Sequence, residues 1–248
     1  YLDITGEMSI EPRASLRYQF RNNQVISISY GLHSQMQATY MYFAVPDSQV
    51  VNGVPVFNAE RKLSNQTLAF SKSHHAVLGY DYFLGTFFKI RTEAYYQYLW
   101  NVPVYKVPSS VSALNRGAIF NRFYPYYDMQ NTGRGYNYGL ELTLEKLFHR
   151  HYFFMFSGSL FESKYKNESN GQWANTDFNG NFMANLLGGM EYQVGKQKKN
   201  SINFGGKITY GGGKRYSPID IEASNAVMDV VPVDEEVNTL QFADYNRV

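Results

Sequence analysis

The sequence contains no cysteine and no long apolar run. Without cysteine among its 248 residues, the chain has no disulfide bonds and no thiol chemistry, although this absence alone does not fix a compartment. No uninterrupted apolar stretch reaches the roughly 18 residues of a transmembrane helix, which excludes a helical membrane protein. The formal net charge is only +2, so the charge balance does not call for nucleic acid or an acidic partner.

The sequence is instead rich in aromatic residues and in polar/apolar alternation. Aromatic residues make up 17% of the chain. In the stretch 136–145, Tyr, Tyr, Leu, Leu and Leu alternate with Asn, Gly, Glu, Thr and Glu. Successive side chains of a strand point to opposite faces, so this pattern predicts a strand with one apolar and one charged face. The run is far longer than a typical strand of about 5–6 residues.

Eight such runs are predicted, joined in pairs by short turns. The Asn22-Asn23 turn is attributed to the left-handed backbone that asparagine tolerates. Long connections separate the pairs, and an acidic, proline-containing segment follows from about residue 214. The predicted runs cover 8–20, 24–36, 68–83, 87–101, 134–147, 151–165, 182–195 and 201–213, and the long connections cover 37–66, 102–132 and 166–181.

This order predicts an all-β fold, namely an antiparallel transmembrane β-barrel segment of about eight long strands. Short turns then lie on the periplasmic side and long loops outside. A soluble barrel would show the same alternation with its faces exchanged, so the pattern alone leaves that alternative open. Aromatic residues at the run ends favour the membrane, because they match interfacial girdles; they are Tyr18, Phe20, Phe83, Tyr98, Trp100, Phe148, Tyr152 and Tyr165.

Several stretches carry a family resemblance. They are Glu-Pro-Arg at 11–13, the segments 30–35, 73–75, 78–80 and 93–99, Pro-Val at 103–104 and, longest of all, NTGRGYNYGLELTLEK at 131–146. Together they resemble the barrel of a TonB-dependent outer-membrane receptor of the Bacteroidota type, over nearly the whole chain.

The resemblance implies that residues 1–248 are a late part of such a barrel, without its plug domain, TonB box and terminal strands. The first and eighth strands would then be unpaired edges. It implies a non-enzymatic transport protein of the bacterial outer membrane that imports a glycan, a metal chelate or another large solute. Implied partners are outer-membrane lipid, the plug domain of the same protein, the TonB complex through the intact protein and a surface lipoprotein as a further candidate. No cofactor is expected.

Two other functions remain open. A small, self-contained eight-stranded outer-membrane barrel with a structural or adhesive role would pair its first strand with its eighth. A secreted β-rich enzyme would need a clustered acid/base pair. Glu141 and Glu145 share a face but lie about 13 Å apart along a strand, whereas a glycosidase pair needs about 5–9.5 Å.

The candidate site residues fall into two sets. The polar members of the runs are predicted to face a wet lumen, where they contact the plug, form cross-strand ion pairs, or both: Arg13, Arg17, Lys89, Arg91, Glu93, Asn137, Glu141, Glu145, Glu191 and Lys207. The aromatic residues of the connections either stack on a ligand at the extracellular mouth or pack among themselves, and we favour packing. They are Phe120, Phe123, Tyr124, Tyr126, Tyr127 and Trp173.

Other motifs point to no catalytic, cofactor or metal site. His74 and His75 are adjacent, so on a strand they face opposite sides and cannot chelate one metal together. The segments 149–151 (His-Arg-His) and 196–199 (Lys-Gln-Lys-Lys) are interpreted as solvated turns. The run 211–214 (Gly-Gly-Gly-Lys) lacks the spacing of a phosphate-binding loop.

Overall fold

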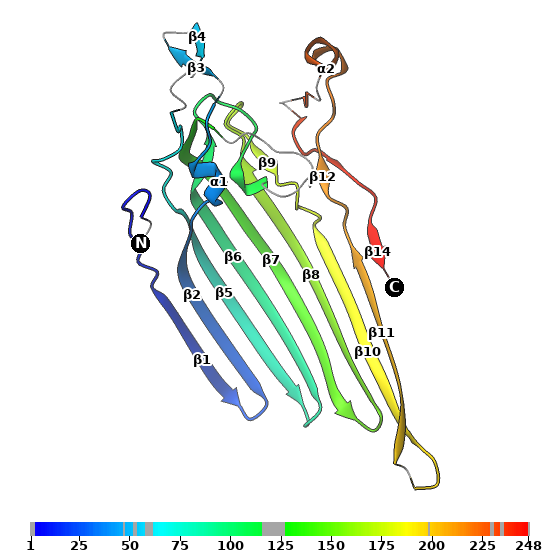
Figure 1. Ribbon diagram of the computed structural model, residues 1–248. Helices are drawn as coiled ribbons and strands as arrows, with labels where there is room; N and C mark the ends of the chain where they lie inside the picture. The colour runs from blue at the N-terminus through cyan, green and yellow to red at the C-terminus, as the bar shows by residue number, and fades with distance from the viewer. Residues whose placement is uncertain are drawn as a thin grey trace.

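The computed structural model is dominated by one antiparallel sheet. It describes residues 3–46, 48–51, 54–57, 62–115, 127–197, 199–228, 231–233 and 236–247. The sheet has ten strands, of which nine follow the order β1-β2-β5-β6-β7-β8-β10-β11-β14 and β9 pairs with β8. Figure 1 shows the long strands side by side, with the short turns at the bottom and the long connections at the top. The two chain ends lie at opposite sides of the sheet (Figure 1).

All eight predicted runs form strands, and each pairs in antiparallel fashion with the next run along the chain. The alternating pattern therefore predicted the sheet correctly. In the described residues, no helix is long and apolar enough to cross a bilayer. The eight strands are β1 (Arg13–Arg21), β2 (Gln24–Gln35), β5 (Ser71–Leu84), β6 (Phe88–Tyr105), β7 (Met129–His149), β8 (Tyr152–Lys166), β10 (Phe182–Val194) and β11 (Asn200–Gly211).

Several predicted boundaries are wrong. The first strand was predicted from residue 8 but begins at Arg13, directly after Pro12, which has no N–H to donate to a ladder. Strands β6 and β7 extend into the predicted loop 102–132, to Tyr105 and from Met129. The pairing of β6 with β7 shifts register between Leu99 and Val104. That irregularity accommodates Pro103, because a bulge tolerates a residue that cannot donate a ladder hydrogen bond.

The short turns lie close to their predicted positions, but one explanation fails. Asn22 and Asn23 form the β1–β2 turn, yet neither has a positive φ. The left-handed backbone occurs instead at Arg150 (φ 51°) and His151 (φ 77°), which form the β7–β8 turn one residue later than predicted. Asparagine is therefore not needed at the first turn for the reason given.

The long connections contain short elements of their own. The β2–β5 connection holds α1 (Thr39–Tyr42), β3 (Ser48–Val51) and β4 (Val54–Phe57), and the next holds the 3-10 helix η1 (Ala113–Asn115). The third holds β9 (Trp173–Asn175), which pairs with β8. After β11 follow β12 (Arg215–Tyr216), α2 (Ile221–Val227), β13 (Leu240–Gln241) and β14 (Tyr245–Arg247).

The prediction that both end strands are unpaired is wrong for the eighth. Strand β14 pairs with the end of β11, from Thr209 opposite Arg247 to Gly211 opposite Tyr245. The first strand, β1, pairs only with β2 among the described strands. Across the described residues the sheet is open, with β1 and β14 as its ends, so the first and eighth strands do not pair with each other.

A conventional core is found beside the long connections. Met41 and Tyr42 of α1 pack with Leu68 and Met129, and all four are at most 2% exposed. Asn65 joins the same site, because its side chain donates to the carbonyl of Met41 (2.8 Å) and accepts from the N–H of Met129 (3.0 Å). This cluster fixes the β2–β5 connection to the start of β7.

Candidate functional site

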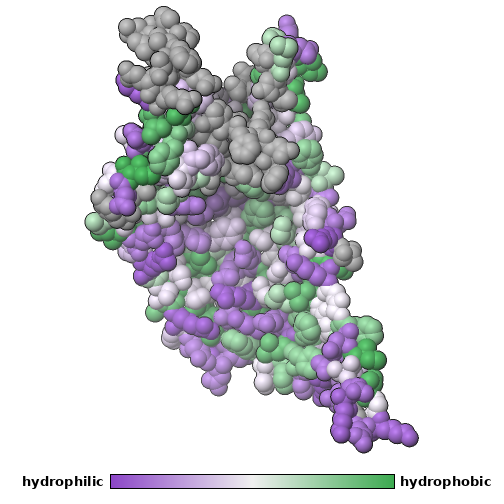
Figure 2. Space-filling view, in the orientation of Figure 1, coloured by the Kyte–Doolittle hydropathy of each residue, from purple (hydrophilic) through white to green (hydrophobic). Residues whose placement is uncertain are grey.

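The strand register gives the sheet a polar face and an apolar face. Residues directly opposite each other in a sheet share a face, and the pairings place all ten polar residues predicted from the sequence on one face. We call this the polar face. Figure 2 shows hydrophilic side chains gathered over the middle of the sheet on this side. Whether this face borders a lumen remains a prediction.

The opposite, apolar face carries exposed hydrophobic side chains. One continuous row across it consists of Leu16, Ile28, Leu78, Ala94, Leu140 and Leu160. The five larger members are between 52% and 66% exposed. Monomeric soluble proteins seldom expose a contiguous apolar patch of more than a few hundred Å². The row therefore marks a surface made for an apolar environment or partner.

Aromatic residues border the apolar face at the long-connection end. His74 stacks on Trp100 (ring centroids 4.4 Å apart), and the Tyr30 hydroxyl lies 2.7 Å from His74 Nδ1. His75 instead lies on the polar face, which confirms that the adjacent histidines point apart. The prediction of an interfacial girdle is wrong for two residues. Phe83 and Tyr165 lie on the polar side, and Tyr165 is buried with its hydroxyl donating to the carbonyl of Ser110.

An ion cluster on the polar face centres on Asp81, a residue that the sequence analysis did not single out. Its carboxylate lies 3.4 Å from Arg17 Nη2, 3.4 Å from Lys89 Nζ and 3.8 Å from Arg91 Nε. The Asp81 side chain is only 10% exposed, while those of the three cations are between 29% and 64% exposed. One carboxylate thus compensates three predicted lumen-facing cations. Asp81 shares a face of β5 with His75, so the alternation of that strand is a sequence signal from which Asp81 could have been predicted.

The other predicted polar residues are paired unevenly. Arg91 Nη2 donates to Glu93 (2.8 Å), and Arg13 donates to Glu11 (2.8 Å). Lys89 lies directly opposite Glu145 in the register, but no ion pair joins them. Within the described chain, four predicted residues form no side-chain hydrogen bond or ion pair: Glu141, Glu145, Glu191 and Lys207. Their charged groups are available for another partner.

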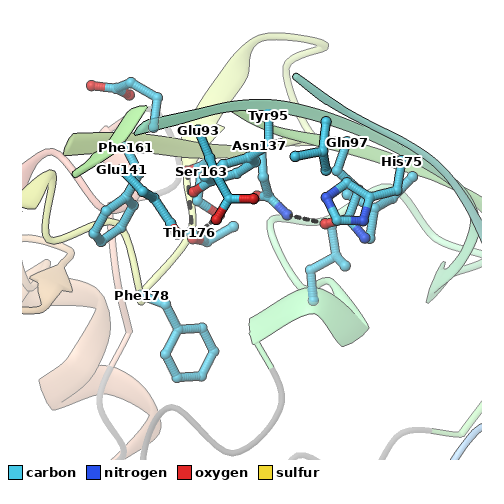
Figure 3. Close-up of a pocket in the computed structure, with 14 residues that line it drawn as sticks. His75, Glu93, Tyr95, Gln97, Asn137, Glu141, Phe161, Ser163, Thr176 and Phe178 are labelled. Atoms are coloured by element: carbon cyan, nitrogen blue, oxygen red, sulfur yellow. Dashed lines mark hydrogen bonds between the residues drawn. The ribbon is translucent and has the colours of Figure 1, made fainter. Parts of the chain in front are cut away.

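A cavity of about 620 Å³ opens on the polar face under the long connections. Its wall comes from β5 to β8, and its roof from Leu114 of η1 and the segment after β9. Figure 3 shows Asn137 and Gln97 joined by a hydrogen bond, and Phe178 apart from the strand residues. The lining residues are His75, Val77, Glu93, Tyr95, Gln97, Leu99, Leu114, Asn137, Glu141, Phe161, Glu162, Ser163, Thr176 and Phe178.

Hydrogen bonds preorganise the polar part of this cavity. Asn137 Nδ2 donates to Gln97 Oε1 (2.8 Å), and Gln97 Nε2 donates to Ser73 Oγ (3.2 Å). Thr176 Oγ1 donates to Ser163 Oγ at 2.8 Å (Figure 3), which fixes the roof to β8. Amide, hydroxyl and carboxylate groups thus stand beside aromatic rings, a combination that suits recognition of a polar ligand or a protein segment. Only Glu93, Asn137 and Glu141 of the lining residues were predicted.

The predicted aromatic residues of the connections are only partly described. Phe120, Phe123, Tyr124 and Tyr126 lie outside the described residues. The Tyr127 ring lies 6.4 Å from that of Tyr105, and the Trp173 ring packs edge-on against Tyr136 at 4.8 Å. Neither lines the cavity. Ligand stacking by these side chains remains a prediction.

The segment before β1 is tied to the sheet by two carboxylates. Glu11 accepts hydrogen bonds from the N–H and the hydroxyl of Ser34 and from Arg13, and these bonds lower the pKa of its carboxyl group below the ordinary value of 4.5. Glu7 accepts from the N–H of Phe70 (2.7 Å) and pairs with Lys72 (3.1 Å). Both contacts lie at the long-connection end of the sheet.

No protein-family model and no curated protein matches this sequence. Solved structures with a similar fold include the following two. The FrpB iron transporter from Neisseria meningitidis (F3-3 variant) matches with a TM-score of 0.56 and 11% identity, over 95% of this chain and 30% of that one. The ferric-catecholate import receptor Fiu from E. coli K12 matches with a TM-score of 0.53 and 13% identity, over 82% of this chain and 24% of that one.

The likeness is one of fold alone. At these identities it confirms the predicted fold class, an antiparallel barrel segment of long strands, and leaves the ligand open. This chain spans less than a third of the length of either receptor.

Proposed function

We propose that this chain is a section of the barrel wall of a TonB-dependent outer-membrane receptor, with no catalysis of its own. The observation that carries the proposal is the sheet itself. Its long strands combine an exposed apolar face with a charged face, and short turns at one end with long connections at the other (Figure 1). In outer-membrane barrels, the apolar face contacts lipid and the charged face lines the interior. The short turns lie in the periplasm and the long connections lie outside the cell.

The fold likeness to two iron-import proteins supports the proposal. In this function the intact receptor imports a large or scarce nutrient when the TonB complex displaces its plug domain. The polar face contacts the plug, and the unpaired Glu141, Glu145 and Glu191 are its candidate contacts. The proposed substrate is a metal chelate, a glycan or another large solute. The proposal also includes a surface lipoprotein as a partner and a receptor of the Bacteroidota type.

The alternative of a small, self-contained eight-stranded barrel predicted a pairing between the first and the eighth strand. In the described chain, β11 pairs with β10 and β14 and β1 pairs with β2. No observation favours that alternative.

Cysteine labelling of the intact receptor tests the topology. The chain has no cysteine of its own, and any cysteine outside it is first replaced by serine. Val107→Cys places a thiol in the β6–β7 connection, where Val107 is 75% exposed, and Gln197→Cys places one in the short β10–β11 turn. A membrane-impermeant maleimide is expected to label Val107→Cys in intact cells and Gln197→Cys only after the outer membrane is permeabilised. The reverse pattern, or recovery of the receptor outside the outer-membrane fraction, would overturn the proposal.

A further inference from the structure

Four glycines meet in the middle of the pairing of β10 with β11. Gly188 lies opposite Gly206, and Gly189 lies opposite Gly205. The first pair belongs to the apolar face, because Gly188 also lies opposite Phe154, whose row continues to Lys146 and Phe88. The second pair belongs to the polar face. The missing side chains at Gly188 and Gly206 leave a hollow of about 580 Å³, which we call the glycine notch.

The walls of the glycine notch are apolar. Leu186 and Ile208 border it on the side of the long connections, Met190 and Phe204 on the side of the turn, and Tyr152 and Phe154 on the side of β8. A Cβ atom built on Gly206 would meet no atom within 4 Å. The space above this glycine is therefore open, and its apolar walls suit a hydrocarbon chain.

Positive charge lies in the turns beyond the glycine notch. The sequences of the two neighbouring turns, 147–151 and 195–199, contain Arg150, Lys196, Lys198 and Lys199 and no Asp or Glu. Lys146 lies in β7 directly before the first of these turns and forms no ion pair in the described chain. Its Nζ donates to the carbonyls of His149 (2.9 Å) and Tyr152 (2.7 Å) and lies 3.6 Å from the centre of the Tyr152 ring. Among the described residues, no carboxylate forms an ion pair with Lys146, Arg150, Lys196 or Lys199.

The two basic turns lie on either side of one lipid leaflet's depth from the notch. Four residues separate Phe154 from Arg150, or about 13 Å of strand, and seven separate Gly206 from Lys199, or about 23 Å, at 3.3 Å per residue. The strands of outer-membrane barrels tilt by about 35–45°, which reduces these lengths to about 10 Å and about 18 Å along the membrane normal. Half of the hydrocarbon core is about 15 Å thick, which lies between the two values. A lipid whose headgroup lies beside the turns therefore reaches the notch with its acyl chain. Basic residues at the membrane surface attract anionic headgroups.

We propose that the glycine notch binds an acyl chain of one anionic phospholipid whose headgroup lies at Arg150, Lys196 and Lys199. The site rests on the proposed function, because it requires the apolar face to lie in a bilayer with the short turns at its inner surface. A barrel contacts lipid over its whole apolar face, whereas the proposed site binds one lipid of defined charge at a defined position.

The test is native mass spectrometry of the intact, detergent-purified receptor with added phosphatidylglycerol or phosphatidylcholine. Gly206→Leu fills the notch. Gly205→Leu is the matched control, because it adds the same side chain one residue away on the polar face, where a Cβ meets only the carbonyl oxygen of Gly188 at 3.7 Å. Phosphatidylglycerol is expected to bind the wild type and Gly205→Leu equally, and Gly206→Leu about three- to tenfold more weakly, since the substitution removes packing contacts.

A second variant tests the headgroup. The triple substitution Arg150→Gln, Lys196→Gln and Lys199→Gln is expected to remove a preference of about tenfold or more for phosphatidylglycerol over phosphatidylcholine, given the contribution of each basic residue near an anionic surface. The acyl chain still fits the notch in this variant, so phosphatidylcholine binding stays as in the wild type. An unchanged preference would overturn the headgroup assignment.

Two outcomes separate this proposal from the proposed function. Equal phosphatidylglycerol binding by wild type and Gly206→Leu, in a receptor that fractionates with the outer membrane, overturns the notch alone. Absence of the wild-type receptor from the outer membrane overturns the proposed function. Heat-modifiable migration in electrophoresis verifies that each variant is folded. Should Gly206→Leu not fold, Gly206→Ala takes its place and is expected to weaken binding in the same direction by less, with equal binding again overturning the notch.

Discussion

Apolar side chains are arranged in opposite ways in two regions of this molecule. In the row from Leu16 to Leu160 across the strands, the five larger side chains are more than half exposed. In the cluster of Met41, Tyr42, Leu68 and Met129 beside the long connections, they are at most 2% exposed. The cluster is the arrangement expected in water, because removal of apolar side chains from water stabilises the fold. The described residues do not cover the row, which is the arrangement expected of a surface that faces lipid.

The largest effect is expected from a charge placed on the apolar face. Leu140→Arg should destabilise the intact receptor in liposomes by about 3 kcal/mol, because a cation near the bilayer midplane of a barrel costs about 2–4 kcal/mol. Ser159→Arg, on the polar face directly opposite Glu141, is the control and should change stability by less than about 1 kcal/mol. Urea unfolding in liposomes measures both. Equal losses in the two variants would remove the distinction between the faces.

The buried cluster should respond to loss of volume instead. Met41→Ala is expected to cost about 2 kcal/mol, at the low end for a buried Met→Ala change because the cluster is small. The effect should be local. The N–H of Met129, which donates to Asn65, should exchange with solvent deuterium faster, while amides in the middle of β7 stay protected. Met36→Ala, at a residue 44% exposed, should leave the exchange unchanged, and a matching increase there would count against a packed cluster.

On the polar face, Asp81 should matter more than the other acids. Asp81→Asn leaves Arg17, Lys89 and Arg91 without their shared carboxylate and is expected to cost about 1 kcal/mol, since the cations are partly exposed and screened. Glu145→Gln, on the same face but without an ion pair in the described chain, should cost less than Asp81→Asn. Unfolding at low and high salt checks this, because the loss in Asp81→Asn should shrink as salt is raised. Equal effects of the two substitutions would contradict the cluster's role.

The smallest effect concerns pH at the edge of the polar face. Hydrogen bonds from Ser34 and Arg13 lower the pKa of the Glu11 carboxyl group below 4.5. Its contribution to stability is therefore complete above pH 4.5 and is lost as the pH falls through the lower, folded-state pKa. Glu11→Gln should speed deuterium exchange at the Ser34 N–H relative to wild type at neutral pH, and the difference should shrink in acid. A difference that grows in acid would reverse the assignment.

The strands could be predicted because their signals are local. Alternation from Tyr136 to Glu145 defined both faces of β7, and the two-residue period placed ten polar side chains on one side. Turn residues separated the runs to within a few positions. The boundary errors have a physical cause as well, since a register shift lets Pro103 stay within a strand that was predicted to end before it.

The site depended on contacts that sequence order does not reveal. Asp81 compensates Arg17, which lies 64 residues earlier, and only the register brings the two together. The cavity roof comes from η1 and the segment after β9, which pack over β8 through Thr176 and Ser163. Strand β14 returns to β11 from beyond a helix and two short strands. Nothing in the local pattern of these segments specifies their partners.

Fluorescence quenching tests the central claim, that one face of the sheet meets lipid and the other does not. Single cysteines at Leu140 and Glu141, adjacent in β7, are labelled with a small fluorophore in the intact receptor and reconstituted in bilayers with brominated acyl chains. The account predicts strong quenching at position 140 and little at position 141. Quenching at 141 equal to or greater than that at 140 would contradict it.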